Sequence, residues 1–573
     1  MSTPRTIAIV GAVAGGASAA ARARRTNEHA RIILIERGPH ASFANCGLPY
    51  YVGGEIADRD RLLLVRPERF RDWLGVELRT GHEALAIDPA ARRLVVRDLA
   101  AGRDESLSWD RLILAPGAAP IRPPVAGADA ANVYTLRDLR DADRLHAAVT
   151  SGARRAVVVG AGYIGLELTE MLARRGLEIT VVERLPQVLQ SLDPELAAAV
   201  SDELRRQGVC VRLGGGLDGF RVDESGRVGA VVLSDGTEIE TDLVVLALGV
   251  RPETGLAIEA GLALGPSGGI RVDDYMRTSA DGIYAVGDAV EYVHAVTGRP
   301  SLMPLAGPAT RAGRIAGEHA ATDTAPAMAP ILGTSIVRVF GVVAGSTGLT
   351  RRQAVAAGLP FRELLVPGHD HATYYPGAAP LLLKVLYHPQ ERRLLGAQVV
   401  GREGVDKRLD VLATAIRLGG SVEDLASLDL AYAPPYGSAR DPIHIAGFMA
   451  ENESRGLERF VAPQELAALP VGTQLLDVRN PAERAADPCP DALAIPLAEL
   501  RARVGELDRE RPIVTICKGG QRAYFASRIL QQRGFVDVRT ATGGMMAWHG
   551  AQSSSSSVLT ASAAIGRPAA PSV

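Results

Sequence analysis

Two stretches of the chain repeat one pattern of apolar and glycine positions. In each, a short apolar run leads into a glycine-rich turn, a helix-like stretch and a second apolar run closed by an acid, over Ile7 to Glu36 and over Ala156 to Glu183. This order is typical of a βαβ unit that binds a dinucleotide. A third apolar run, Ile283 to Asp288, follows the second unit. We therefore expect one nucleotide domain to be interrupted by another and to resume near Gly249 to His319.

The pattern changes twice further along the chain. From about Ile331 to Met449, apolar and polar positions alternate, and the sequence predicts strands over Thr334 to Phe340 and Leu381 to Tyr387 and a helix over Asp406 to Leu418. After the polar stretch Glu451 to Arg455, strand-helix alternation resumes. It includes the apolar runs Leu475 to Arg479 and Ile513 to Ile516.

These elements predict an α/β chain of four domains. Two are Rossmann-like dinucleotide-binding domains, at 1–115 with 249–325 and at 120–248. An α+β domain is expected at 330–450 and a smaller α/β domain at 456–550. Residues 551–573 contain five consecutive serines and little apolar content, so we expect this tail to be disordered.

Composition excludes several classes of function. The chain has 573 residues and a formal net charge of -2, so no global field attracts nucleic acid or an anionic membrane. No apolar stretch is long enough for a membrane helix, and the first residues lead directly into an apolar strand rather than a signal peptide. Four cysteines cannot form a disulfide framework in so long a chain. We expect a cytoplasmic protein with reduced thiols and no metal centre.

The second glycine-rich turn matches the dinucleotide fingerprint. Gly160, Gly162 and Gly165 allow a tight turn, close approach of a pyrophosphate and packing of helix on strand, and the helix N-terminus offers free amides. Glu183 is placed to accept the ribose hydroxyls of NADH, whereas the adjacent Arg184 would hold the 2′-phosphate of NADPH. Both NADH and NADPH therefore fit the sequence. The residues expected to contact NAD(P)H are Gly160, Gly162, Tyr163, Ile164, Gly165, Glu183 and Gly249.

The first glycine-rich turn departs from that fingerprint, and a cysteine follows it. Val13 stands where the second glycine is expected, although Glu36 ends the next strand at the usual distance. Downstream, Cys46 lies in a Ser42-Phe43-Ala44-Asn45-Cys46-Gly47 segment. With these residues the first 450 positions resemble the coenzyme A disulfide reductase and NADH oxidase branch of the pyridine nucleotide-disulfide oxidoreductases. The resemblance extends over Gly11 to Gly16, Leu112 to Gly117, Leu248 to Pro252 and Gly404 to Arg408.

The resemblance implies FAD as a cofactor, since the turn ending at Asp288 is similar to the FAD-contacting motif of two-dinucleotide flavoproteins. The residues expected to contact FAD are Gly11, Ala12, Gly15, Gly16, Glu36, Arg37, Asn45, Ala115, Gly117 and Asp288. Dithiol members place a second cysteine five positions after the first, where this chain has Tyr51. Cys46 must therefore form a mixed disulfide with a small thiol or a sulfenic acid.

Coenzyme A is the small thiol that the resemblance implies. Its expected contacts are Ser18, Arg22, Arg25, Ser42, Asn45 and Arg440. Without the resemblance, the helical spacing of Arg22 and Arg25 would indicate only a solvated helix face. The resemblance also implies a homodimer in which catalytic Tyr374 and Tyr432 reach Cys46 from the second subunit. Thr310 is a departure, because relatives usually have asparagine there.

The C-terminal hundred residues resemble a rhodanese domain. Cys517 follows an apolar strand and begins the loop Lys518, Gly519, Gly520, Gln521 and Arg522, whose backbone amides would stabilise a thiolate or a persulfide. A rhodanese fold that serves only for docking is the alternative. Of the other cysteines, Cys210 is expected to pack in the core and Cys489 to be a surface thiol.

Together these features predict an FAD-dependent NAD(P)H reductase of coenzyme A disulfide, coenzyme A persulfide or polysulfide. Its redox cysteine would be Cys46, and the rhodanese domain would handle sulfane sulfur at Cys517. One alternative is an NADH oxidase that reduces oxygen through a sulfenic acid on Cys46. Another is a rhodanese-type sulfurtransferase whose flavoprotein part is regulatory.

Overall fold

The computed structural model describes residues 4–551, which form two compact units. The first comprises residues 4–181 and 217–333, and the second comprises residues 182–216 and 334–551. The tail predicted to be disordered lies outside the described residues from Gln552 onward. Its first residue, Ala551, is buried at the end of a helical stretch, so the fold extends at least to this position.

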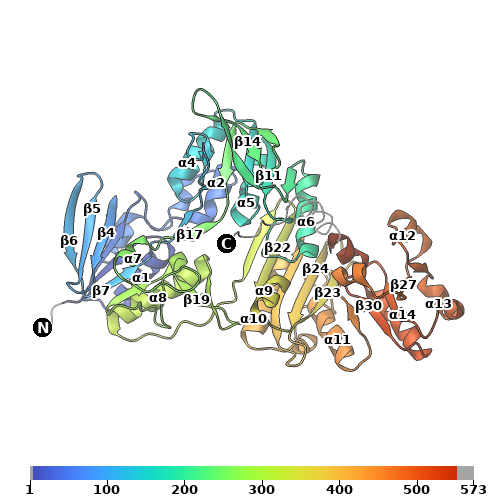
Figure 1. Ribbon diagram of the computed structural model, residues 1–573. Helices are drawn as coiled ribbons and strands as arrows, with labels where there is room; N and C mark the ends of the chain where they lie inside the picture. The colour runs from blue at the N-terminus through green and yellow to red at the C-terminus, as the bar shows by residue number, and fades with distance from the viewer. Residues whose placement is uncertain (1–3, 552–573) are drawn as a thin grey trace, which may run out of the picture. The chain divides into compact units, whose positions relative to one another are not determined.

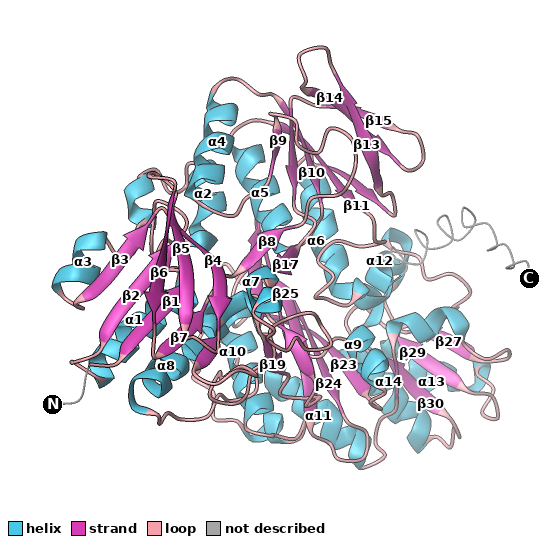
Figure 2. Ribbon diagram, turned by 60° about the vertical axis from the view of Figure 1, so that its left-hand side comes forward, coloured by secondary structure: helices cyan, strands magenta, loops and turns pink. Residues whose placement is uncertain are grey.

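The first unit contains the predicted interrupted sheet. Its strands pair in the order β18-β7-β1-β2-β3, all parallel, and strand β18 returns to the sheet after the second nucleotide-binding segment. The strands are β1 (Thr6–Val10), β2 (Arg31–Glu36), β3 (Val76–Thr80), β7 (Arg111–Leu114) and β18 (Ile283–Ala285). Helices α1 (Ala14–Thr26) and α8 (Ala306–Thr322) pack against each other beside this sheet (Figure 2).

Glycines allow these two helices to approach closely. A Cβ atom on Gly313 would meet the Gly15 carbonyl oxygen at 2.2 Å, and one on Gly317 would meet the Ala19 oxygen at 2.3 Å. No side chain larger than hydrogen fits at either position without a shift of backbone. The contact fixes the N-terminal end of α1, where the first glycine-rich turn delivers its free amides.

The second nucleotide-binding segment has the same plan. Strand β10 (Arg155–Val159) leads through a glycine turn into α5 (Tyr163–Arg174) and then to β11 (Glu178–Glu183). Parallel to β10 runs β16 (Leu243–Leu246), which also pairs with β9 (Val133–Tyr134). The unit also contains two antiparallel three-stranded sheets. One consists of β4 (His82–Asp88), β5 (Arg93–Asp98) and β6 (Arg103–Ser108), and the other of β13 (Leu217–Val222), β14 (Val228–Leu233) and β15 (Glu238–Glu240). Two antiparallel strand pairs are present as well, β8 (Ala118–Pro120) with β17 (Val250–Pro252) and β19 (Glu291–Val293) with β20 (Pro300–Leu302).

An antiparallel sheet of five strands forms the centre of the second unit (Figure 1). Its order is β21-β22-β25-β24-β23, with helix α10 (Val405–Arg417) against β22 and β25 and helix α11 (Pro442–Ser454) against β23 and β24. The strands are β21 (Ser335–Val339), β22 (Val342–Gly348), β23 (Arg362–His369), β24 (Pro380–Tyr387) and β25 (Leu394–Gly401). Strand β23 is an edge strand of this sheet.

The second unit ends in a parallel sheet of order β26-β30-β29-β27-β28. Its strands are β26 (Phe460–Val461), β27 (Gln474–Asp477), β28 (Leu493–Ala494), β29 (Ile513–Ile516) and β30 (Val538–Ala541). Helix α14 (Gln521–Gln532) packs on β29 and β30. Its first turn includes Gln521 and Arg522, which were predicted to belong to the loop that Cys517 begins. The side chain of Cys517 belongs to the apolar core beneath this sheet.

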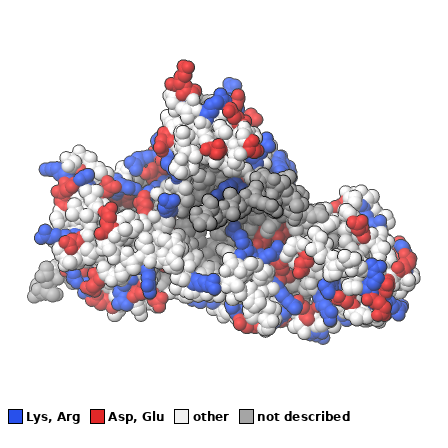
Figure 3. Space-filling view, in the orientation of Figure 1, with Lys and Arg blue, Asp and Glu red and all other residues white. Residues whose placement is uncertain are grey.

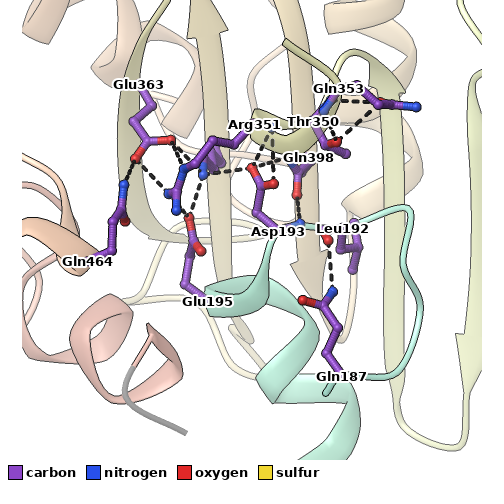
Figure 4. Close-up of polar contacts among 11 residues, drawn as sticks. Gln187, Leu192, Asp193, Glu195, Thr350, Arg351, Gln353, Glu363, Gln398 and Gln464 are labelled. Carbon is purple, nitrogen blue, oxygen red and sulfur yellow. Dashed lines mark hydrogen bonds and ion pairs between the residues drawn. The ribbon is translucent and has the colours of Figure 1, made fainter. Parts of the chain in front are cut away.

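A buried group of charges lies within the second unit (Figure 4). Lys384 is fully buried, and its ammonium group forms ion pairs with Asp193 at 2.7 Å and Glu363 at 2.8 Å and also with Glu195. Arg351 pairs with both glutamates. Burial lowers the pKa of Lys384, but the surrounding carboxylates raise it by more, so the side chain is held as a cation. The cluster joins β23 and β24 to the start of α6 (Pro194–Arg206).

Two cysteines differ from expectation. The prediction that Cys210 packs in the core is wrong: it begins β12 (Cys210–Leu213), and the alternation of that strand places it on the exposed face with Arg212. Cys489 is half-buried rather than a surface thiol, because it packs beside the cluster of Met545 and Trp548. Burial raises the pKa of Cys489 to about 11, which makes this thiol a poor nucleophile.

The described residues include no helix that is both long and apolar enough to cross a membrane. On the face shown in Figure 3, basic and acidic side chains are interspersed. This mixture agrees with the near balance of 63 basic and 65 acidic residues.

Candidate functional site

A cavity of about 940 Å³ opens in the first unit where the carboxyl ends of the parallel strands meet the glycine turn. Ligands of open α/β sheets bind at this edge of the sheet. Nine of the ten residues predicted to contact FAD line it, namely Gly11, Gly15, Gly16, Glu36, Arg37, Asn45, Ala115, Gly117 and Asp288. The tenth, Ala12, is fully buried behind the turn.

The geometry of the first turn explains why Val13 is tolerated. Gly11 has φ +91°, and a Cβ there would meet the Ala115 carbonyl oxygen at 2.1 Å, while a Cβ on Gly16 would meet the Gly11 oxygen at 1.8 Å. Val13 has a negative φ of -96° and directly precedes α1, so this position does not require the left-handed conformation that favours glycine. The two glycines that the backbone demands are therefore present, and the substitution falls where no glycine conformation is needed.

Two carboxylates line the same cavity in different environments. Glu36 accepts hydrogen bonds from the backbone amides of Ala12 at 2.8 Å and Gly38 at 2.7 Å, so its position is fixed by the turn. The carboxylate of Asp288 forms no hydrogen bond or ion pair with any described residue, and burial raises its pKa. A half-buried acceptor without a partner indicates a ligand with hydroxyl or amide donors at this end of the cavity.

Cys46 lies next to this cavity. It occupies the one-turn helix η1 (Asn45–Gly47), immediately before α2 (Leu48–Val52), and its side chain is exposed. Desolvation by the surrounding protein raises the pKa of the Cys46 thiol, and the negative charges of Glu167 and Asp288 raise it further. Ser42, which precedes it, is buried with a left-handed φ of +50°, so the loop that carries Cys46 is conformationally constrained.

The position of a second redox cysteine is filled by Tyr51. Its hydroxyl donates to Asp143 at 3.2 Å, and its ring stacks on His146 with centroids 5.0 Å apart. The neighbouring Tyr50 donates to Glu167 at 3.1 Å. All four cysteines are free thiols. Glu167 was not among the predicted site residues, although its place two residues after Gly165 in the fingerprint could have indicated it.

The second glycine turn is open toward a ligand. Gly160 has φ +106°, and a Cβ there would meet the Ala247 oxygen at 2.3 Å, whereas a Cβ on Gly162 would meet nothing within 4 Å. Gly162 precedes α5 without a side-chain cap, and Ile164 in its first turn is 38% exposed. The amides at the start of α5 are therefore accessible. Glu183 ends β11 and accepts a hydrogen bond from the Leu185 amide at 2.9 Å.

The residues predicted to bind coenzyme A fall into different settings. Arg22 forms an ion pair of 2.7 Å with Glu318, so a phosphate would have to compete with this carboxylate. Arg25 is exposed on the same helix, and Ser18 is half-buried beneath α8. Arg440 is exposed in the second unit. Thr310, where relatives usually have asparagine, donates to the carbonyl of Gly307 within its own helix.

The structure brings the two predicted catalytic tyrosines together. The hydroxyls of Tyr374 and Tyr432 lie 2.8 Å apart, although both rings are largely exposed, and this hydrogen bond raises the pKa of Tyr374. Arg408 is fully buried and fixes both loops, because it donates to the Asp370 carbonyl at 2.7 Å and to the Asp441 carboxylate at 2.7 Å. In the sequence Arg408 is recognised only as part of a motif, and its buried contacts with both loops could not be predicted.

The C-terminal loop surrounds Cys517 with donors. Cys517 is 2% exposed, and its sulfur accepts a hydrogen bond of 3.1 Å from the amide of Gly520, which has φ +106°. Arg522 forms a two-pronged ion pair with Glu483, at 2.7 and 2.6 Å, and holds the pKa of that carboxyl at about 2. Lys518 is exposed at the rim. The loop geometry suits an anion on sulfur.

Comparison with known proteins covers nearly the whole chain. Family models match at residues 5–313 (pyridine nucleotide-disulphide oxidoreductase), at 334–442 (the dimerisation domain of that family) and at 462–551 (rhodanese-like domain). Coenzyme A disulfide reductase of Staphylococcus aureus (strain JH9) is 32% identical over 446 residues, 78% of this chain and 99% of that protein.

Two solved structures are similar over both units. The reduced CoADR-RHD protein of Bacillus anthracis has 39% sequence identity and a TM-score of 0.91, with 96% of this chain and 98% of that chain covered. The NAD-dependent persulfide reductase of A. fulgidus has 36% identity and a TM-score of 0.88, with 95% and 100% covered.

Proposed function

Because the chain belongs to the pyridine nucleotide-disulphide oxidoreductase family, we propose that it is an FAD-dependent NAD(P)H reductase of coenzyme A disulfide and coenzyme A persulfide. Its rhodanese-like domain would handle sulfane sulfur at Cys517. The observation that carries the proposal is Cys46, an exposed thiol beside a dinucleotide cavity with Tyr51 where a second cysteine would stand. Of the two relatives that match over both units, one is named CoADR-RHD and the other an NAD-dependent persulfide reductase, which supports the proposal.

The cavity residues fit FAD. The free amides at the start of α1 suit a pyrophosphate, Glu36 suits ribose hydroxyls, and the unpartnered Asp288 suits a hydroxylated chain. When bound, FAD would supply the relay of two electrons from the nicotinamide to sulfur. The turn at Gly160 to Gly165 would hold the nicotinamide cofactor. Glu183 favours NADH, and the exposed Arg184 would permit NADPH.

Cys46 would act as nucleophile on the substrate sulfur. Its thiolate attacks coenzyme A disulfide, which forms a mixed disulfide and releases one coenzyme A thiolate. With coenzyme A persulfide, attack on the sulfur bonded to carbon forms the same mixed disulfide and releases hydrosulfide. Two electrons from NAD(P)H and one proton then convert the mixed disulfide to the Cys46 thiolate and coenzyme A thiol. Both substrates thus share one intermediate and one reductive step.

Tyr374 and Tyr432 would stabilise the departing thiolate. Their exposed hydroxyls form a pair that can donate one proton outward, and Arg408 fixes the loops that carry them. We propose that they serve the Cys46 of a second subunit in a homodimer formed through the dimerisation domain. Arg25 and Arg440 would contact coenzyme A phosphates. Arg22 would do so if its ion pair with Glu318 were broken.

Mass spectrometry of the full-length protein as isolated tests the proposal. We expect a coenzyme A adduct on the peptide that contains Cys46, removed by dithiothreitol and absent from the Cys46→Ser variant. A sulfenic acid on Cys46 without any adduct, together with oxygen consumption that needs no disulfide, would instead support an NADH oxidase. Thiosulfate-to-cyanide sulfur transfer as the main activity, with no NADH-linked reductase activity, would support a sulfurtransferase with a regulatory flavoprotein part.

A further inference from the structure

The edge strand β23 has backbone groups that form no hydrogen bond within its own sheet. Leu365 is a residue of this strand whose amide and carbonyl point away from the neighbouring strand β24. Leu365 is also 1% exposed, so water does not satisfy these groups. Buried backbone groups require another partner, and edge strands are usually covered for this reason.

A single side chain of the rhodanese-like domain satisfies both groups. The Leu365 amide donates to Thr542 Oγ1 at 2.8 Å, and the same hydroxyl donates to the Leu365 carbonyl oxygen at 3.2 Å. Thr542 is 2% exposed and directly follows the end of β30. A hydroxyl is the one small group that can accept and donate in this way.

Thr542 is connected to the Cys517 loop by the next four residues. Gly543 and Gly544 both have left-handed φ values, +72° and +56°, and a Cβ on Gly544 would meet the Cys517 carbonyl oxygen at 2.3 Å. The amide of Met545 then donates to that oxygen at 3.0 Å, and the amide of Met546 donates to the Lys518 oxygen at 3.2 Å. The backbone that holds the loop therefore starts from the anchor at Thr542.

Two more contacts join the same domain to alternate residues of β23. Gln464 donates to the carboxylate of Glu363 at 2.7 Å, next to the buried charges of Figure 4. Pro367 lies beside Gly519 of the Cys517 loop, close enough to touch a Cβ placed there, at 3.4 Å. Glu363, Leu365 and Pro367 thus form one row that contacts the domain from its first helical turn to its cysteine loop.

We propose that Thr542 is a positioning residue for sulfur transfer at Cys517, acting by anchoring the cysteine loop to β23. The inference rests on the proposed sulfur handling by the rhodanese-like domain and deepens it. Sulfur transfer then depends on the dimerisation domain as a support for the loop, and the domain does not work as an independent module. The described hydrogen bonds of Thr542 join it to Leu365 and Val461, neither of which is among the residues assigned to the Cys46 site, so we do not expect the reductase reaction to require Thr542.

The test compares variants of the full-length protein loaded with FAD. Thr542→Val keeps the size of the side chain and leaves the Leu365 groups unpaired, so kcat for thiosulfate-to-cyanide transfer is expected to fall about tenfold. KM for thiosulfate should change little, because the loop still accepts the anion. Thr542→Ser keeps the hydroxyl and should restore kcat to within about twofold of wild type. NADH-linked reduction of coenzyme A disulfide should be unchanged in both variants.

Thr473→Val is the matched control. It makes the same chemical change in the same domain, at a buried hydroxyl without a partner, before β27 and so at the opposite end of the sheet from Cys517. Its kcat should equal that of wild type. If Thr542→Val does not fold, Gln464→Met removes a single hydrogen bond from the same row and should lower kcat about threefold.

Each result has one meaning. A wild-type kcat in Thr542→Val, or in a Gln464→Met variant that replaces it, overturns the inference, as does an equal fall in Thr473→Val or a failure of Thr542→Ser to rescue. Absence of sulfur transfer in the wild-type protein would instead overturn the proposed sulfur handling. The Cys517→Ser variant is the negative control that gives the background rate of the assay.

Discussion

At the scale of single residues, the four cysteines differ in what surrounds the sulfur. Cys46 is exposed beside a dinucleotide cavity, and Cys517 is buried but accepts a hydrogen bond from the Gly520 amide. Cys489 is half-buried with its pKa raised to about 11, and Cys210 is exposed on a strand without such donors. Cys517 therefore lies where a loop amide can stabilise a thiolate or a persulfide, whereas Cys46 lies in the turn before α2 with its pKa raised by burial and by the charges of Glu167 and Asp288.

The tyrosine pair gives the first prediction at this scale. Tyr374→Phe and Tyr432→Phe each remove one hydroxyl of the 2.8 Å pair, so steady-state turnover of coenzyme A disulfide should fall by about tenfold or more. Reduction of bound flavin by NADH in a stopped-flow instrument should keep its rate, because that step involves neither hydroxyl. Tyr436→Phe, a change at another exposed tyrosine nearby in the chain, is the control. Slower flavin reduction in the first two variants would contradict the assigned role.

Sequence reasoning predicted the backbone conformation where it depends on residues that are near in the chain. The glycines of both turns and the spacing of Glu36 follow from backbone conformation, which neighbouring residues determine. It failed where the partner is distant in the chain. Arg22 meets Glu318, and Thr542 meets Leu365, and nothing in the local pattern specifies either pair. For Cys210, the short apolar stretch predicted a strand but could not show which face is covered.

At the scale of elements, strand and helix periods located several segments of the fold. The predicted strand Leu381 to Tyr387 corresponds to β24, and the predicted helix Asp406 to Leu418 to α10. The pattern of apolar and polar positions did not predict that Lys384, in the middle of β24, is fully buried among carboxylates. Those carboxylates come from α6 and β23, so the residue is tolerated only because the tertiary structure supplies its partners.

The connection from α11 to β26 gives a prediction at this scale. Glu458 in this connection is buried, and burial raises its pKa to about 7, with the charge of Glu453 adding and that of Arg528 opposing. The folded protein therefore binds a proton that the unfolded chain releases between about pH 4.5 and 7. Stability should fall as pH rises through this window, by roughly 3 kcal/mol in total, and the loss is complete above about pH 7.

The Glu458→Gln variant removes the titrating carboxyl and with it the loss of stability at higher pH. In scanning calorimetry of the full chain, the variant should unfold at a higher Tm than wild type near pH 8, and the difference should shrink toward zero near pH 4.5. Glu451→Gln, at an exposed acid of α11, should show no such dependence. A Tm difference that is independent of pH would mean that Glu458 is charged in the folded protein at all these pH values.

At the scale of the whole molecule, the chain combines two candidate sites for sulfur chemistry. The first unit holds the dinucleotide cavity and Cys46, and the second holds the tyrosine pair and the Cys517 loop. In the proposed homodimer the tyrosines would act on the Cys46 of the other subunit. If coenzyme A carries sulfur between Cys517 and Cys46 without leaving the protein, the carrier would reach the second cysteine at a high local concentration and would not have to diffuse through solution.

Steady-state NADH oxidation by wild type, Cys46→Ser and Cys517→Ser tests this account most directly. Each protein is assayed with coenzyme A disulfide and with coenzyme A persulfide. We predict that Cys46→Ser loses activity on both substrates, whereas Cys517→Ser keeps its activity on the disulfide and is impaired on the persulfide. Activity of Cys46→Ser on either substrate would contradict Cys46 as the redox centre, and equal rates of Cys517→Ser and wild type on both substrates would contradict a role for the rhodanese-like domain in the reaction.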